Sequence, residues 1–94
     1  MTGDDQQGWR VELSATAVRS LDRLPPKVAV AVVEFVTVVL PTNPHRLSKP
    51  LRFELEGLHV ARRGDYRVTF RIDEDDHVLR IGRIEHRAHI YKAH

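Results

Sequence analysis

A pair of prolines, Pro25-Pro26, divides the first half of the chain into two apolar segments and is the strongest constraint on its fold. Proline lacks a backbone N–H and clashes with the preceding helical turn, so one helix cannot run through the pair. Pro26 can still occupy the first turn of a second helix, where no donor is needed. The sequence therefore predicts two short helices that meet at this point.

The segment before the prolines, residues 15–24, has the spacing of an amphipathic helix. Ser14 stands directly before it and can cap its first free N–H groups. Residues 9–13, "WRVEL", alternate between apolar and polar and predict a strand. The apolar side of the predicted helix consists of Ala17, Val18, Leu21 and Leu24.

The segment after the prolines, "KVAVAVVEFVTVVL", is ambiguous because valine favours strands. Its length and its proline start favour a helix over residues 27–40. Only Lys27, Glu34 and Thr37 form a polar stripe, so almost the whole circumference is apolar. Two interpretations remain open. The helix is buried tightly in a helical hairpin, or a partner chain covers the part that the sheet leaves exposed.

The second half of the chain predicts a loop followed by a β-meander. Residues 40–51 hold three prolines and read as the loop. Gly57 begins one strand, the Gly64-Asp65 pair turns into the next, and residues 73–76 form a polar turn before the last strand. Leu79 and Ile81 share a side of that strand but Ile84 does not, so we expect a bulge near Gly82.

The element order is therefore β-α-α-β-β-β, which predicts an α+β fold. We expect a small antiparallel sheet of about four strands with the N-terminal helical hairpin packed on one face. Residues 1–8 are expected to be a disordered tail and residues 9–94 a single domain. The start is acidic and the apolar run is too short for a membrane span of roughly 20 residues. With no cysteine in the chain, this indicates a cytoplasmic protein that does not enter membranes.

Positive charge is concentrated in the middle of the chain. The net charge is only +2, but residues 45–72 carry seven basic and three acidic side chains. In the predicted strand that starts at Tyr66, alternation places Arg67 and Arg71 opposite the apolar residues. One sheet face is used for the core, so the other is free to present guanidinium groups to a polyanion.

Several kinds of chemistry have no support in the sequence. The acidic run "DEDDH" lacks the glycine and the distal glutamate of a calcium loop. His86 and His89 are not part of an HExxH pattern, and there is neither a GxSxG elbow nor a phosphate-binding glycine loop. We therefore expect no metal site and no cofactor.

Cleavage of RNA without a metal remains, because RNA supplies its own nucleophile in the 2′-hydroxyl. Such a reaction needs proton transfer at both oxygens and cations that stabilise the charge on the phosphoryl oxygens. His86 or Glu85 can move protons, Arg67 and Arg87 can clamp the phosphate, and Tyr91 can stack on a base or donate a proton.

At these residues the sequence resembles the RelE-like toxins of bacterial toxin–antitoxin pairs, within the RelE/ParE superfamily. The resemblance spans nearly the whole chain after residue 8. Its motifs are a G-x-Y-R turn and strand, here Gly64 to Arg67, and a terminal H-R-x-x-[VI]-Y element, here His86 to Tyr91. It implies a compact ribonuclease that enters the ribosomal decoding site and cuts messenger RNA without a metal. It also implies a cognate antitoxin that neutralises the toxin, and a toxin–antitoxin complex that binds operator DNA and represses its own promoter.

Carried over by position, the resemblance puts Arg67 and Arg87 at the scissile phosphate and Tyr91 at the base or the proton transfer. The chain departs from messenger-cutting relatives at residues 58–61, where those relatives carry basic side chains, and at Glu85, where some are basic. Glu85, His86 and Glu54 all remain open as the general base. The residues expected along the RNA path are Lys49, Arg52, Arg62, Arg63 and Arg71.

Two other functions remain open. A ParE-like branch of the same fold poisons DNA gyrase and cleaves no RNA, and a plain nucleic-acid-binding module would only give salt-dependent affinity. The terminal H-R-x-x-I-Y element favours the ribonuclease branch, because gyrase poisons generally lack it. The missing basic residues at 58–61 point the other way.

Overall fold

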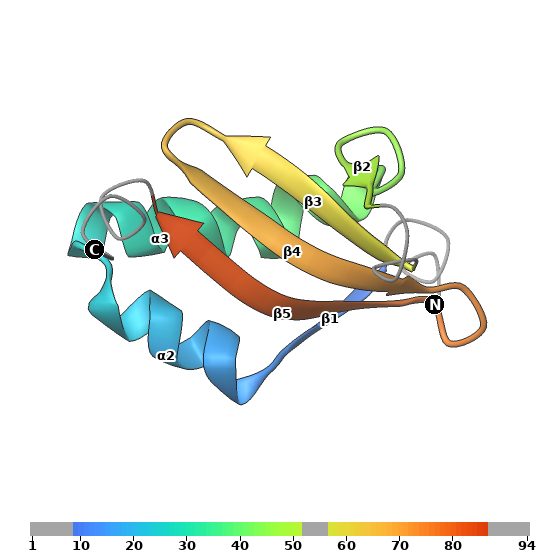
Figure 1. Cartoon of the computed structure of the whole chain (residues 1–94), viewed down its shortest axis with the longest axis horizontal. Helices are drawn as coiled ribbons and strands as arrows, with labels where there is room; N and C mark the ends of the chain where they lie inside the picture. Colours follow the sequence, from blue (N-terminus) through green and yellow to red (C-terminus); the bar gives the residue numbers. More distant parts are fainter. Residues whose placement is uncertain (1–8, 52–56, 87–94) are drawn as a thin grey trace.

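The computed structural model describes residues 9–51 and 57–86 and shows a five-stranded sheet with two α-helices (Figure 1). The predicted α+β class is confirmed, and the predicted tail over residues 1–8 lies outside the described residues. The elements in chain order are β1 Arg10–Leu13, α2 Ala15–Arg23, α3 Pro26–Glu34, β2 Lys49–Pro50, β3 Leu58–Arg63, β4 Tyr66–Asp73 and β5 Val78–His86.

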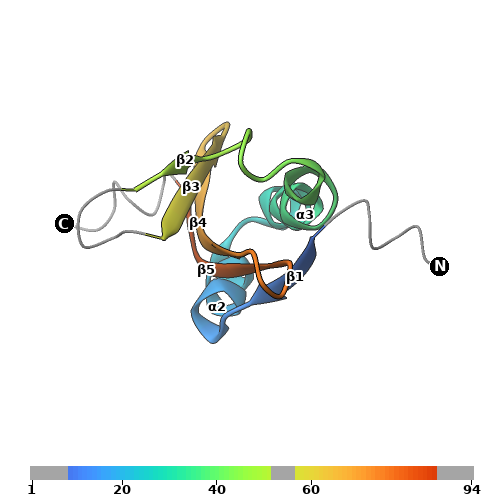
Figure 2. The same cartoon turned by 90° about the vertical axis from the view of Figure 1, so that its right-hand side faces the viewer.

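The helix α2 begins and ends within one residue of the prediction, and α3 begins at the proline pair as predicted but ends at Glu34 instead of residue 40. The Ser14 hydroxyl accepts a hydrogen bond from the backbone N–H of Ala17 at 3.0 Å and donates one to the carbonyl of Gly82 at 2.9 Å. The cap of α2 is thereby tied to the last strand. Figures 1 and 2 show α3 running along one face of the sheet and α2 beside β5.

The second helix continues beyond α3 through a π-helical turn, Phe35–Val39, and a short 3-10 turn, Leu40–Thr42. A π-helical turn holds one extra residue, which brings Val38 onto the same side as Val30 and Val33. Val32, Phe35, Val36 and Leu40 are buried, whereas Val30 is 67% exposed and Val38 is 58% exposed. The described residues therefore do not cover this helix all round.

The sheet differs from the prediction in two details. The strand order is β1-β5-β4-β3-β2, and β1 pairs with β5 in parallel, so the sheet is mixed instead of antiparallel. A short strand, β2, lies within the segment predicted as a loop and pairs with β3. Alternation within a strand carries no information about its neighbour, which is why the pattern missed both pairings.

The bulge expected near Gly82 is confirmed. Phe70 of β4 pairs with Ile81 and Thr69 pairs with Arg83, so Gly82 is the extra residue. It brings Ile81 and Ile84 to the same side, where both are buried. Gly64, at φ +59°, makes the two-residue turn between β3 and β4.

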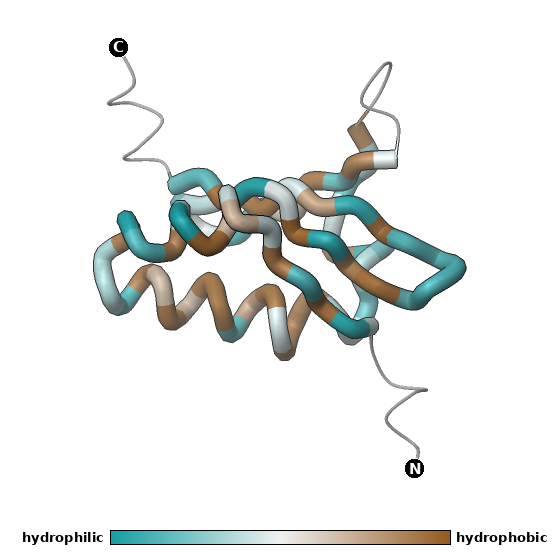
Figure 3. The backbone as a smooth tube through the Cα atoms, turned by 90° about the horizontal axis from the view of Figure 1, so that it is seen from below, coloured by the Kyte–Doolittle hydropathy of each residue, from teal (hydrophilic) through white to brown (hydrophobic). Residues whose placement is uncertain are grey.

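Apolar side chains from α2, α3, β3, β4 and β5 form one buried cluster. Apolar and polar positions alternate along the strands in Figure 3, which is the pattern of a sheet with one buried face. Among the described residues, no helix is long and apolar enough to cross a membrane.

Candidate functional site

The sheet presents its cations on the face away from α3, called the open face below. Residues directly opposite one another in neighbouring strands have their side chains on the same face. Arg62 of β3 lies opposite Arg67 of β4, and Arg67 lies opposite Glu85 of β5. The two-residue turn at Gly64 fixes this register. The open face is formed by the polar residues Arg62, Arg67, Thr69, Arg71, Arg80, Arg83 and Glu85, together with Leu58 and Val60.

An ion pair lies on this face near the turn between β3 and β4. The Nε of Arg67 donates to Oε1 of Glu85 at 3.0 Å, and the two side chains are 37% and 31% exposed. Like charges directly opposite one another are unfavourable, and Arg62 faces Arg67 in this way. Glu85 offsets that repulsion, so three strands contribute to one charged row.

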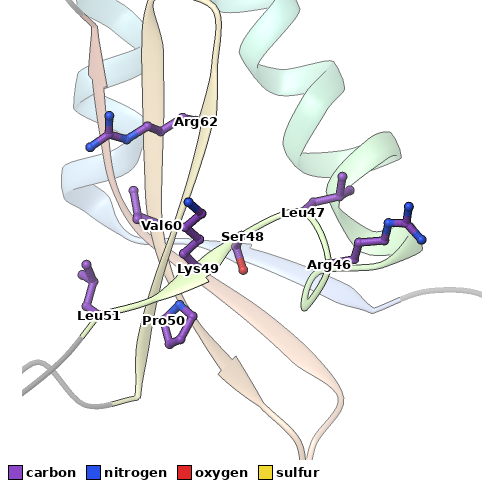
Figure 4. A pocket seen from close by; sticks show the side chains of 8 residues that line it. All are labelled: Arg46, Leu47, Ser48, Lys49, Pro50, Leu51, Val60 and Arg62. Carbon is purple, nitrogen blue, oxygen red and sulfur yellow. The ribbon is translucent and has the colours of Figure 1, made fainter.

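A groove of about 650 Å³ lies beside this row, between β2 and β3 (Figure 4). Arg62 reaches it from β3, Lys49 from β2 and Arg46 from the segment before β2. Leu47, Leu51 and Val60 supply apolar surface in the same groove. The groove can therefore hold a ligand that combines negative charge with a flat apolar group.

Arg71 lies on the open face at the far end of β4, against Gly57. Gly57 has φ +93°, and a Cβ added to it would lie 2.7 Å from Nη1 of Arg71. Only glycine leaves room for the guanidinium group in this position. The sequence pattern identified Gly57 as a strand start but not as the residue that Arg71 packs against.

Arg80 is basic and also lies in β5, but it is held by carboxylates. It donates to Glu12, to Asp73 at 3.0 Å and to Asp76 at 3.5 Å. The backbone N–H of Asp76 and the guanidinium of Arg80 hold the pKa of Asp73 below its usual value. This network closes the turn between β4 and β5. In contrast, among the described residues Arg62, Arg71, Arg83 and Lys49 have no carboxylate within salt-bridge distance.

Two predicted residues lie on the other face. Arg63 is adjacent to Arg62, so strand alternation turns it towards α3, and its guanidinium lies 5.2 Å from the ring centre of Phe35. His86 pairs with Tyr66 on that same side, whereas its neighbour Glu85 shares the open face with Arg67. Burial raises the pKa of Tyr66, and the charge of Arg63 opposes that shift.

The remaining predicted residues lie outside the described part of the chain. These are Arg52, Arg87 and Tyr91, together with Glu54 as a possible base. Sequence reasoning in turn did not single out Arg46 and Arg83, because neither belongs to a motif. In residues 9–51 and 57–86, no group of three or more histidine, aspartate or glutamate side chains could hold a metal ion.

Comparison with known proteins gives this surface a family context. Residues 11–91 match the model of the ParE toxin of the parDE type II toxin–antitoxin system. The chain is 53% identical over 88 residues to a protein named Toxin RelE from Mycobacterium tuberculosis, which covers 94% of this chain and 91% of the relative. It is 46% identical over 84 residues to Toxin RelG of the same organism, covering 89% of this chain and 97% of the relative.

A solved structure agrees with these matches. The crystal structure of the toxin–antitoxin complex RelBE2 from M. tuberculosis matches with a TM-score of 0.84 and 45% identity, covering 87% of this chain and 94% of that chain. The family model, the relatives and the fold thus coincide. The chain belongs to the ParE toxin family of type II toxin–antitoxin systems, and within that family it is a RelE-like toxin.

Proposed function

We propose that the protein is a metal-independent endoribonuclease that cuts messenger RNA in the ribosomal decoding site and so inhibits translation. The observation that carries this proposal is the row of Arg62, Arg67 and Glu85 beside the basic groove. The groove lining suits a single-stranded nucleotide, because cations can contact its phosphate while apolar side chains contact its base. The names of the RelE and RelG relatives support the same activity.

In the proposed reaction the 2′-hydroxyl attacks the adjacent phosphorus and the 5′-oxygen leaves. Arg67 and Arg87 bind the non-bridging oxygens, where negative charge increases in the transition state. A planar guanidinium group suits this role because it can donate two parallel hydrogen bonds. Lys49, Arg52, Arg62 and Arg71 hold the strand on either side, and Tyr91 supports the base or donates a proton.

The general base remains open between Glu85, His86 and Glu54. Glu85 shares the face of Arg67, which favours it on position, although its Oε1 is already bonded to Arg67. His86 lies on the opposite face of β5. Arg63 also lies on that face of the sheet, so we expect it to contribute less to RNA binding than Arg62 does.

We further propose a cognate antitoxin as the protein partner. The solved relative is a toxin–antitoxin complex, and Val30 and Val33 of α3 and Val38 of the following π-helical turn are exposed. Apolar surface of this kind commonly marks an interaction site. Co-expression with the antitoxin should raise the yield of folded toxin, because a ligand of the native state stabilises it. The complex, and not the toxin alone, is expected to bind operator DNA in the cytoplasm.

The decisive experiment maps messenger 5′ ends by primer extension in a translating extract. We expect cuts in phase with codons, and we expect Arg67→Ala to lower the cleavage rate about 10²–10³-fold, as loss of one charge-stabilising contact does. Arg87→Ala and Tyr91→Ala should also lower the cleavage rate. Arg19→Ala is the matched control, since Arg19 lies on α2 and, in the described part of the chain, its side chain bonds only to Thr16.

The same extract tests the alternative that the family description raises, a ParE-like inhibitor of DNA gyrase. Intact messenger together with gyrase-dependent DNA cleavage or loss of supercoiling would replace the ribonuclease proposal. If the protein binds messenger without cutting it and has no effect on gyrase, its function is that of a nucleic-acid-binding module.

A further inference from the structure

The ion pair between Arg67 and Glu85 has a geometry that assigns Glu85 a specific task. Glu85 contacts Arg67 through Nε, at the side of the guanidinium group, with 3.0 Å between Nε and Oε1. Among the described residues, the terminal nitrogens of Arg67 have no hydrogen-bond partner. Within the described part of the chain, the carboxylate therefore fixes the plane of the group without using its terminal donors.

The neighbours of Arg67 favour an anion at those donors. Arg62 lies directly opposite Arg67 across the β3–β4 pair, and Arg62 has no carboxylate partner in the described part of the chain. Two guanidinium groups with one carboxylate leave an excess of one positive charge. A phosphate-sized anion that contacts both arginines would neutralise this excess.

The pair is too exposed to be explained by stability. Ion pairs whose side chains are about one third exposed contribute little to folding, because water screens the attraction. Orientation is a stronger reason for its presence, since a displacement of about 1 Å in a group that holds the substrate can cost on the order of 10² in rate.

We propose that Glu85 is a positioning residue and not the general base: it holds Arg67 so that the terminal nitrogens of Arg67 bind the phosphate of the RNA substrate. This inference rests on the proposed ribonuclease function. It also predicts that Glu85 stays bonded to Nε when RNA is bound, because the two ligands use different edges of the guanidinium group.

The first test compares wild type with Glu85→Ala and Glu85→Asp in single-turnover cleavage of ribosome-bound messenger. Alanine removes the acceptor for Arg67 Nε, which glutamine would keep. We expect Glu85→Ala to lower the cleavage rate about 10²-fold while RNA binds equally well or a few-fold more tightly, because a negative charge is removed. The pH dependence of the remaining rate should keep its acidic limb. In an Arg67→Ala background, Glu85→Ala should have almost no further effect. Glu85→Asp, which keeps the charge, should recover part of the rate.

Two results in this assay would overturn the inference. If the acidic limb disappears in Glu85→Ala, Glu85 is the base. If Glu85→Ala cleaves as fast as wild type, the carboxylate has no positioning role.

A second measurement separates this inference from the proposed function. Nuclear magnetic resonance of the arginine side chains follows the Arg67 Nε–H while a short single-stranded RNA is added. We expect this proton to exchange slowly in wild type and quickly in Glu85→Ala, and RNA to shift the terminal N–H signals without releasing Nε. If this holds but wild type cleaves no messenger, the ribonuclease proposal fails and the positioning of an anion-binding arginine stands. Fast exchange in wild type, or release of Nε by RNA, contradicts the inference itself.

Discussion

The two faces of the sheet differ in almost every physical property although the same strands form both. On the face towards α3, Val68, Phe70, Leu79 and Ile81 are at most 1% exposed. On the open face, the same strands carry Arg67, Arg71 and Arg83. Because successive side chains alternate between the faces, a chain of this size can place its stabilising residues and its ligand-binding residues in one sheet. Changes on one face should therefore have little effect on the property that the other face provides.

The largest contrast is expected between Phe70 and its neighbour Thr69. Phe70 is fully buried, so Phe70→Ala should lower the free energy of unfolding by about 3–5 kcal/mol. Thr69 lies on the open face, and Thr69→Ala should change the free energy of unfolding by roughly 0.5 kcal/mol or less. Urea unfolding measures both, and similar losses for the two variants would contradict the division between faces.

Arg62 and Arg63 give a second contrast between adjacent residues. Arg62→Ala should weaken binding of single-stranded RNA and reduce the slope of log affinity against log salt by about 0.7, the value for one phosphate contact. Arg63→Ala should have the smaller effect on RNA affinity. Since Arg63 packs over Phe35, it should instead lower stability by about 0.5–1 kcal/mol. RNA titrations at several salt concentrations measure the slope for each variant. Equal slopes for the two variants would mean that both arginines contact the RNA.

His59 is a polar residue of β3 opposite Phe70, on the face towards α3. Its Nδ1 is buried and accepts or donates no hydrogen bond of good geometry within the described residues. Burial, with a smaller effect from His45, lowers its pKa below 6.5, and the backbone of Gly57 opposes that shift. Folding therefore opposes protonation: the unfolded chain binds this proton first, so stability falls as the pH drops from about 6.5 through the lower native pKa.

The variant His59→Phe should remove this part of the acid sensitivity. We expect the difference in unfolding free energy between about pH 7.5 and pH 5.5 to shrink, with stability at the higher pH unchanged or increased because an unpaired buried nitrogen is removed. An unchanged difference would mean that His59 does not sense pH.

The smallest effect on stability is expected on the exposed side of α3. Val30→Ser should change the free energy of unfolding by roughly 0.5 kcal/mol or less, because Val30 is 67% exposed. The same change should weaken antitoxin binding if this side is covered in the complex. Ala17→Ser on α2, where the side chain is fully buried, is the contrasting variant and should destabilise the fold.

Much of the fold could be predicted because the relevant signals are local. Ser14, the two prolines and Gly64 each act on their own backbone, and each ends or begins an element where predicted. Even the bulge at Gly82 was visible, because only an extra residue puts Leu79, Ile81 and Ile84 on one side. The candidate site was predicted less completely, since charge alone placed Arg63 beside Arg62, whereas alternation separates them.

The sequence by itself determined which segments form helices and strands and which side of each strand is apolar. These properties depend on periods of 3.6 and 2 residues, which any short stretch displays. Only the tertiary structure decided that β1 lies parallel to β5 and that Arg71 packs on Gly57. It also decided that Glu85 holds Arg67 from 18 positions away. Such pairings depend on the register between strands, which is set by burial of the whole core and by turn geometry, and no local pattern contains it.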